Sequence, residues 1–494
     1  MAIAKICGIE TEYGIHRSNP GDNPVTSASL LINAYIAGLK RAQWDFQDET
    51  PGNDARGFVA GAGTPPEIDV HLVNAVLSNG ARYYVDHAHP EMSTPECASP
   101  LELVLYDKAG EEIVRRSLAL ANSYYPGEGQ LSVHKNNSDG KGNSYGCHEN
   151  YLMDRNTPFA RIAQQVTAHF VTRIIYTGAG KVGEEVRSGG EAANFQLSQR
   201  AEFFEEEIGL ETTLKRPIVN TRDEPHADPR RFRRLHVIVG DANLSEVATF
   251  LKVGTTALVL ALIEEGRLDG AGLLLENPVQ ALHQVSRDIG LARTVELVDG
   301  RYLRPIDIQW ELYRFAREYA DDGGLEVLGD EDAGKDLLRR WESCLAVLEE
   351  DPMQLANVLD WVAKLQAVEG YMQRHGLDWQ DPKLKAIDLQ YHDIDPAKSL
   401  YTRLRMERLV DSEAVAVAVA CPPASTRAYF RGMCLTRFPE NVASANWDSI
   451  VFDLGEGPLR KVPMTDPLKG TALHTENLIG QASSVEDLIE RLGA

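Results

Sequence analysis

Two short acidic segments constrain this chain more than any other feature of its sequence. Residues 8–14 read Gly-Ile-Glu-Thr-Glu-Tyr-Gly, and residues 82–91 read Arg-Tyr-Tyr-Val-Asp-His-Ala-His-Pro-Glu. In an extended strand every second side chain points to the same face of the sheet. The side chains expected to share a face are Glu10 with Glu12, and Arg82 with Tyr84 and Asp86.

Carboxylates on two strands favour a site for a metal ion and a phosphate group. Magnesium binds carboxylate oxygens together with phosphate oxygens of a substrate, so several inward-facing acids could hold it against a nucleotide. Any single acid is also explained as a solvent-facing residue of an amphipathic strand. As a set, the acids favour the metal site.

The composition is that of an ordinary globular protein with an unusual charge. Of the 494 residues, 43% are hydrophobic and 25% are charged, as in a folded chain of more than one domain. The formal net charge is −23. Because such a surface repels polyanions, we expect no nucleic-acid partner.

The sequence favours a cytoplasmic location. The six cysteines are scattered without a Cys-x-x-Cys pair, as expected of reduced thiols. The N-terminal residues lack the basic and apolar regions of a signal peptide. The uncharged apolar stretch over residues 253–263 is too short to span a bilayer and predicts a buried helix. We therefore expect no membrane contact.

The hydrophobic pattern mixes strands with long helices and does not alternate them regularly. Helices are predicted over residues 27–42 and over residues 310–376, where the pattern is helical throughout. Residues 103–123 predict the end of a strand followed by a helix, and Ser245 predicts the N-cap of another helix. Strands are predicted over residues 131–135 and 235–239. This pattern favours an α+β fold with an antiparallel sheet.

Two glycine- or proline-rich regions divide the chain. Residues 45–66 predict a long loop inserted beside the site strands, which either acts as a lid or is an inert surface insertion. Pro422 and Pro423 break the chain near its end. They predict a large domain over residues 1–424 and a small one over residues 425–494.

Several familiar motifs are incomplete or missing. Residues 178–183 match Gly-x-Gly-x-x-Gly, but the charged, glycine-broken segment that follows is a poor start for the helix of a dinucleotide site. The sequence has no His-Glu-x-x-His zinc pair and no Gly-x-Ser-x-Gly elbow. His148 and His236 each lie in a strand-like run near a glycine, where a structural role and a ligand role both remain open.

Residues 230–234, Arg-Arg-Phe-Arg-Arg, form the one dense basic cluster in an acidic chain. A solvated charged face would explain this cluster. A local docking site for an acidic partner, which would be repelled elsewhere, would explain it as well.

Five segments resemble the family of Pup ligases and Pup deamidases, which are relatives of glutamine synthetase and the carboxylate-amine ligases and handle the prokaryotic ubiquitin-like protein Pup. They are spread over essentially the whole chain, so the resemblance does not rest on one motif. The segments are residues 8–14, residues 82–94, residues 145–151, residues 235–241 and residues 447–449.

The local sequence is more similar to the deamidase and depupylase branch of that family than to the ligase branch. The ligase pattern after the catalytic strand is Asp-Val-Gly-Ser-His-Pro-Glu, whereas residues 86–91 read Asp-His-Ala-His-Pro-Glu and are one residue shorter. The long insertion before Asn79 also resembles the extra loop of the deamidase branch.

The resemblance implies a glutamine-synthetase-like large domain, in which helices back a curved antiparallel sheet, and a small C-terminal domain. It also implies Mg²⁺ and bound ATP, or ADP with phosphate, as a cofactor that is not consumed. Asp86 falls on the residue essential for catalysis. The residues on metal-binding positions are Glu10, Tyr84 and Glu91, with His148 and His236 as further candidates. Those on nucleotide-binding positions are Arg82, Thr94 and Trp447.

The activity implied is hydrolysis of the C-terminal glutamine of Pup to glutamate and of the isopeptide bond between Pup and target lysines. Asp86 could attack the carbonyl directly or act as a base on water. The partners implied are Pup and pupylated proteins of the bacterial proteasome pathway. Because Pup is acidic, the basic side chains are candidates for its docking site: Arg222, Arg230, Arg231, Arg233 and Arg234.

Three other readings stay open at this point. A Pup ligase would use the same scaffold and consume ATP to make the isopeptide bond. A small-molecule glutamate ligase of the glutamine-synthetase class would join glutamate to an amine. A nucleotide-binding regulatory module would bind ATP without catalysing a reaction.

Overall fold

The fold is built around one large sheet whose strands come from both ends of the chain. The computed structural model describes residues 1–19, 21, 23–38, 42–47, 49–57, 73–127, 129–185, 192–455 and 457–493. The sheet has ten strands in the order β13 (Phe232–Val237), β8 (Cys147–Asp154), β1 (Cys7–Glu12), β6 (His89–Ser93), β5 (Arg82–Asp86), β4 (Asn74–Val76), β3 (Gln43–Trp44), β16 (Val442–Ala445), β17 (Ser449–Phe452) and β18 (Arg460–Pro463).

The pairing of these strands confirms the α+β class and corrects one detail of it. Neighbouring strands are antiparallel throughout, except that β3 and β16 run parallel. The chain reaches β16 only after the whole helical region, so no hairpin dictates the direction of this pair. The sheet is therefore mixed rather than purely antiparallel.

Four smaller two-stranded sheets surround the large one. They pair β2 (Gly14–Arg17) with β7 (Leu131–His134), β9 (Lys181–Val182) with β10 (Phe195–Gln196), β11 (Phe204–Gly209) with β12 (Arg216–Asn220), and β14 (Val295–Glu296) with β15 (Tyr302–Leu303).

Helices supply the rest of the regular structure. The α-helices are α1 (Pro24–Ile36), α2 (Pro100–Tyr124), α3 (Phe159–Thr172), α4 (Ile174–Thr177), α5 (Glu246–Glu264), α6 (Pro278–Ser286), α7 (Pro305–Asp321), α8 (Glu331–Glu350), α9 (Asp360–His375), α10 (Pro382–Tyr391), α11 (Leu400–Arg403), α12 (Ser412–Ala418), α13 (Ala428–Arg437), α14 (Ala472–Gln481) and α15 (Val485–Gly493). Short 3-10 turns are η1 (Ala201–Phe203), η2 (Gly324–Leu328) and η3 (Pro352–Leu355).

Helix α5 is the centre of the main core. The hydroxyl of Ser245 accepts a hydrogen bond from the backbone N–H of Ala248, which confirms the predicted N-cap. The helix packs against α3, α7 and α8 as well as α2. It is long and apolar enough to cross a membrane, but its apolar window is completely buried inside the fold. Its hydrophobicity is therefore explained by core packing.

Two helix boundaries differ from those predicted. Helix α1 covers 24–36 instead of 27–42, because Asn23 caps the N–H of Val25 and a proline occupies its first turn. Helix α2 begins at Pro100, so the strand end predicted near residue 103 is wrong. Ser99 caps α2 by accepting from the N–H of Glu102.

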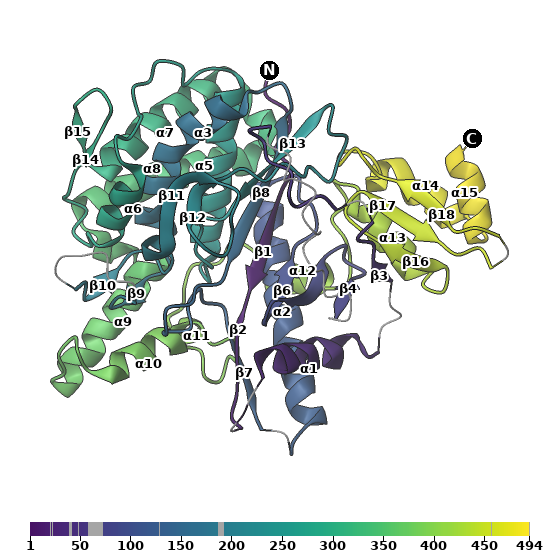
Figure 1. Cartoon of the computed structure of the whole chain (residues 1–494), viewed down its shortest axis with the longest axis horizontal. Coiled ribbons are helices and arrows are strands. Elements are labelled where there is room, and N and C mark those ends of the chain that lie inside the picture. The colour runs from purple at the N-terminus through teal and green to yellow at the C-terminus, as the bar shows by residue number, and fades with distance from the viewer. Residues whose placement is uncertain are drawn as a thin grey trace.

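The C-terminal part has a second hydrophobic core and yet continues the large sheet. Trp44 and Val76 from the first part of the chain pack there with residues from 430–488. Figure 1 shows α13 to α15 and β16 to β18 gathered at one end of the molecule, away from α7 and α8. The division at residue 424 stays a prediction.

The first part of the predicted insertion contacts the segment that precedes β13. Asp54 forms an isolated bridge with Arg222, and its carboxylate accepts a hydrogen bond of 2.9 Å from the Thr221 hydroxyl. The N–H of Thr50 donates to the Glu224 carboxylate. Residues 58–66 of the predicted insertion lie outside the described residues. A role as lid or as surface insertion stays open.

Candidate active site

The strand register brings residues that are far apart in the sequence into adjacent rows. Glu10 lies opposite His148 on β8 and opposite Ser93 on β6, and Ser93 in turn lies opposite Arg82 on β5. In the next row Glu12 lies opposite Glu91, which lies opposite Tyr84.

The predicted alternation is confirmed in both strands. In β1, Glu10 and Glu12 are partly exposed between buried neighbours. In β5 the partly exposed residues are Arg82, Tyr84 and Asp86. One face of the sheet therefore carries the ionisable side chains, while Tyr83 and Val85 point into the core.

The first cluster consists of Glu10, His148 and His236, whose potential ligand atoms lie within 4.8 Å of one another. The Nδ1 atom of His148 is 3.6 Å from the Glu10 carboxylate. Asn150 donates to Glu10 at 2.9 Å, and its side-chain oxygen lies 3.0 Å from Nδ1 of His236. The amide of Asn150 thus orients a carboxylate and an imidazole together.

Electrostatics favour the ionised form of Glu10 and the neutral form of His236 in this cluster. Burial and the neighbouring Arg234 guanidinium lower the pKa of His236 well below its usual value. Burial works to raise the pKa of Glu10, but the hydrogen bond to His148 and the positive charges around it hold the pKa well below its ordinary range. A neutral imidazole and an ionised carboxylate are the forms that bind cations.

The second cluster consists of Glu12, Asp86 and Glu91, again within 4.8 Å of one another. Glu91 is only 3% exposed, and burial together with the charges of Asp86 and Glu12 raises its pKa well above its ordinary value. Tyr84 lies beside it, and burial followed by the charge of Glu91 raises the pKa of its phenol.

Both clusters fit a divalent cation. Three carboxylates crowded on a partly buried surface repel one another, and a cation would relieve that repulsion. In the first cluster, Nε2 of His236 is buried and has no hydrogen-bond partner among the described residues. A buried polar atom without a partner is costly unless a ligand satisfies it. The carboxylate-rich donors suit a hard cation such as Mg²⁺.

The structure splits the predicted metal residues between the two clusters. Glu10, His148 and His236 belong to the first. Glu91 belongs to the second, with Tyr84 next to it. Glu12 was not among the residues named for the metal, and its placement on the same strand face as Glu10 was the signal that brings it into the second cluster. Asp86 shares the second cluster with Glu12 and Glu91, so a cation there would lie next to the predicted catalytic carboxylate.

A separate pocket adjoins the first cluster on the side of the C-terminal part. Thr94 and Trp447 line it together with Gly8, His226 and Arg427. Pro225 and Pro467 add apolar walls. Aromatic and proline side chains are surfaces against which a planar base can pack.

Arg82 stands beside this pocket and not among its lining residues. Its guanidinium is 3.9 Å from the ring centroid of Trp44 and 3.9 Å from that of Tyr84. The Trp44 ring meets Trp447 edge to face at 5.3 Å. The structure therefore connects Arg82 to the pocket through Trp44.

The five arginines predicted as one docking site do not form one surface. Arg234 is partly buried, donates to Asn150 at 2.7 Å and lies 3.8 Å from Glu10, so it belongs to the first cluster. Arg233 is buried and donates to the backbone oxygen of Thr157. Successive residues of β13 point to opposite faces, which separates these side chains.

The other three arginines lie in different surroundings. Arg222 is partly buried beside Asp54. Arg230 and Arg231 are exposed and paired with Asp228 and Asp466. They are the part of the cluster available to a partner.

Comparison with known protein families identifies the family of this chain. The sequence pattern of the family described as "Pup-ligase protein" matches residues 5–451. The chain belongs to the Pup-ligase protein family. The resemblance noted in the sequence is thereby confirmed over nearly the whole chain.

Curated relatives within this family carry two kinds of name. The "Depupylase" of Acidothermus cellulolyticus is 50% identical, with 99% of both chains covered. The "Pup deamidase/depupylase" of Mycolicibacterium smegmatis is 47% identical, again with 99% of both covered. A "Pup--protein ligase" of Xylanimonas cellulosilytica is 37% identical over 96% of this chain and 99% of its own.

Solved structures of Pup-ligase proteins share the fold. The complex between Pup and its ligase PafA superposes with a TM-score of 0.80 at 30% identity, covering 99% of this chain and 95% of the other. PafA in complex with ADP gives a TM-score of 0.73 at 32% identity, covering 82% and 89%. These similarities confirm the fold expected from the sequence.

Proposed function

We propose that this enzyme is a Pup deamidase and depupylase. It converts the C-terminal glutamine of Pup to glutamate and hydrolyses the isopeptide bond between Pup and target lysines. The observation that carries this assignment is the full-length identity of 47–50% to proteins of that name, against 37–41% to ligases of the same family. Pup and pupylated proteins are the corresponding partners.

Asp86 is the residue we propose for the chemical step. It ends β5, with its carboxylate in the second cluster and 39% of the side chain exposed, so a substrate carbonyl can approach it. The ionised carboxylate can attack that carbonyl to form an anhydride, which water then hydrolyses, or it can take a proton from an attacking water. Both routes require the negative charge on Asp86.

The residue after Asp86 adds a positive charge to its surroundings. Nδ1 of His87 lies 2.9 Å from the Asp86 carboxylate, and the hydrogen bond raises the pKa of His87 to about 9. His87 is therefore positively charged at neutral pH. The backbone φ of His87 is 50°, an uncommon conformation for a residue other than glycine. The turn after β5 thus places a cation beside the proposed catalytic carboxylate.

The cofactors we propose are Mg²⁺ and a nucleotide, ATP or ADP with phosphate, that is not consumed. Glu10, His148, His236, Glu12 and Glu91 would hold the cations, with Tyr84 alongside. Thr94 and Trp447 would hold the nucleotide in the adjoining pocket, and Trp44 would position the Arg82 guanidinium by packing against it. When bound, Mg²⁺ would neutralise the crowded carboxylates and stabilise negative charge that develops at the reacting carbonyl.

A Pup ligase is the second candidate, because the family description and the solved neighbours are ligases. The ligase would consume ATP whenever Pup ending in glutamate and a lysine-bearing protein are supplied. The proposed hydrolase would release ammonia or the target protein without forming ADP in matching amount.

An intact-mass assay separates the two. The protein would be incubated with Mg²⁺, ATP and Pup ending in glutamine, while ADP is followed in parallel. We expect conversion of the terminal amide to the acid without matching ADP formation, loss of the conversion in Asp86→Asn, and retention in Glu207→Gln, an exposed carboxylate on β11. An unchanged mass of Pup ending in glutamine, together with ATP consumption and conjugate formation that require Pup ending in glutamate and a lysine-bearing protein, would establish the ligase instead.

A further inference from the structure

A large groove is lined in part by His89, whose Nδ1 lies 3.3 Å from the Glu12 carboxylate of the second cluster. Its volume is about 1160 Å³, larger than the roughly 300–1,000 Å³ of most small-molecule sites. Ala88 and His89, two and three residues after Asp86, line it, and residues of the turn 138–143 also line it and form one wall. A groove of this size, which reaches the turn that follows Asp86, suits a polypeptide segment better than a small ligand.

The turn 138–143 is held in shape by its own polar groups. Ser138 and Ser144 form an isolated bridge across its base. The Asp139 carboxylate accepts from the N–H groups of Lys141 at 2.8 Å and Asn143 at 3.1 Å, and from the Asn143 side chain at 2.7 Å. Residues 139–143 are exposed. The turn is therefore an ordered projection at the rim of the groove.

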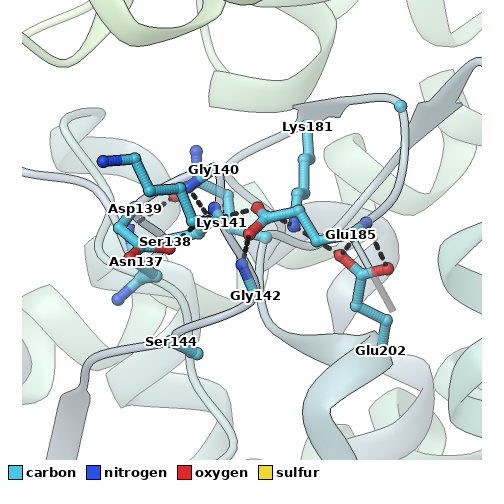
Figure 2. A network of polar contacts seen from close by, with 12 residues as sticks. Asn137, Ser138, Asp139, Gly140, Lys141, Gly142, Ser144, Lys181, Glu185 and Glu202 are labelled. Atoms are coloured by element: carbon cyan, nitrogen blue, oxygen red, sulfur yellow. Dashed lines mark hydrogen bonds and ion pairs between the residues drawn. The ribbon is translucent and has the colours of Figure 1, made fainter. Parts of the chain in front are cut away.

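Glu185 fastens this turn to the opposite segment of the chain (Figure 2). Its carboxylate accepts hydrogen bonds from the Ser138 hydroxyl and, at 2.7 Å, from the N–H of Gly142. Lys181 pairs with Glu185 at 2.6 Å and also with Glu202. The side chain of Glu185 is only 7% exposed. A buried carboxylate with both a charged partner and two hydrogen-bond donors is a rigid attachment.

Tyr145, which follows the turn, connects it to the second cluster. The Tyr145 hydroxyl donates to the backbone oxygen of Ser138 at 3.1 Å and to the Asn136 side chain. The Tyr145 ring stacks on His89 with 4.4 Å between centroids, and Nδ1 of His89 is 3.3 Å from the Glu12 carboxylate. The wall of the groove and the carboxylates beside Asp86 are thus one connected structure.

We propose that Glu185 is a positioning residue that holds the turn 138–143 as a wall of the substrate groove, and that this groove binds the polypeptide segment bearing the scissile carboxamide. The inference rests on the proposed hydrolysis of a carboxamide. Glu185 itself does not touch Asp86, so it acts on binding of the segment and not on bond cleavage.

The test compares Glu185→Ala with Glu184→Ala in the full-length protein with Mg²⁺ and ATP. Glu184 is the neighbouring acid, but its carboxylate pairs with Arg287 at 3.1 Å and does not reach the turn. Glu185→Ala leaves Lys181 paired with Glu202. We expect KM for Pup ending in glutamine and for a Pup conjugate to rise about threefold to tenfold, consistent with loss of charge-assisted hydrogen bonds, while kcat and ATP affinity change less than about twofold.

Two further variants keep the inference falsifiable if Glu185→Ala fails to fold. Glu185→Gln retains an oxygen for the Gly142 N–H, so KM should recover part of the way to that of the parent protein. Ser138→Ala removes one hydrogen bond and leaves the Lys181 ion pair intact, so KM should rise about twofold to threefold.

The failures of the inference and of the proposed function are distinguishable. The role of Glu185 is overturned if the parent enzyme is active and Glu185→Ala has the same KM as Glu184→Ala. If Glu185→Ala does not fold, the same conclusion follows when Ser138→Ala and Glu185→Gln both have the KM of Glu184→Ala. A loss of kcat at unchanged KM overturns it as well, because that result places the effect on the chemical step. A parent protein that hydrolyses neither substrate overturns the proposed function and this inference with it.

Discussion

Glu12 on β1 and Glu91 on β6 lie directly opposite each other in the antiparallel register, and their carboxylates meet that of Asp86 within 4.8 Å. Like charges at this separation destabilise one another in a protein. Burial, together with this proximity, raises the pKa of Glu91. A bound cation would relieve the repulsion between the carboxylates, whose placement otherwise costs stability.

Glu91→Gln should stabilise the cation-free protein and remove most of its response to Mg²⁺. The substitution deletes one of three repelling carboxylates, whereas Mg²⁺ stabilises the parent protein by about 2.7 kcal/mol at a concentration 100 times its Kd. Thermal unfolding with and without Mg²⁺ measures both effects. Glu207→Gln is the control, and an unchanged Mg²⁺ response in Glu91→Gln would argue against a cation at this cluster.

The same residue predicts a pH dependence. The pKa of Glu91 is raised in the folded protein, so the folded state binds its proton more tightly than the unfolded state. Stability is therefore lost as pH rises above the unfolded pKa of about 4.5 and toward the folded value. Without Mg²⁺, the stability advantage of Glu91→Gln should grow over that range. An advantage that is the same at every pH would contradict this origin.

Glu96 should behave in the opposite way. Burial opposes its ionisation, but Arg431 at 2.5 Å and Arg427 at 2.6 Å lower its pKa from 4.5 to about 2. This shift corresponds to about 3 kcal/mol that is present above pH 4.5 and lost as pH falls toward 2. Glu96→Gln should lower the unfolding free energy by roughly that amount at pH 7 and by much less near pH 2.

Chemical denaturation at several pH values checks the Glu96 prediction. Glu331→Gln is the matched control, because its pair with Lys335 is exposed on the surface of α8 and contributes little. A penalty for Glu96→Gln that does not shrink in acid would mean that the three side chains are not coupled as the geometry indicates.

Trp447→Ala should weaken nucleotide binding more than Trp44→Ala does. Trp447 lines the pocket, whereas Trp44 acts on it through contacts with Trp447 and Arg82. Stacking on an aromatic ring contributes about 1–3 kcal/mol per base, so Kd should rise about tenfold or more for Trp447→Ala. Calorimetric titration with ADP and Mg²⁺ measures it. Equal affinity in the parent protein and Trp447→Ala would place the nucleotide elsewhere.

Charge reversal of Arg230 and Arg231 together should weaken Pup binding, with the largest effect at low salt. Both are exposed, and neither contributes to the metal clusters. Long-range attraction of an acidic chain falls as salt screens it. Binding measured at two ionic strengths tests this, with charge reversal of the exposed Arg314 on α7 as control. Affinity that is unchanged at both salt concentrations would remove the docking role.

The sequence by itself determined which strands carry the site and which faces of those strands look outward. The two-residue period of Glu10 with Glu12 and of Arg82 with Asp86 is a local property of an extended chain, so it survives in any fold that keeps those strands. The cap at Ser245 and the burial of α5 were predictable for the same reason. Family membership was likewise predictable from short sequence motifs.

Only the tertiary structure decided which side chains meet. Strand register is set by contacts between segments distant in sequence, and it places Glu12 opposite Glu91, a pairing that the period within each strand cannot reveal. Arg233 and Arg234 were separated by the alternation of β13, and Arg222, Arg230 and Arg231 by their different partners outside that strand. Glu185 and Ser138, in contrast, came together across 47 positions. Local periodicity orients side chains, but packing of the whole chain selects their neighbours.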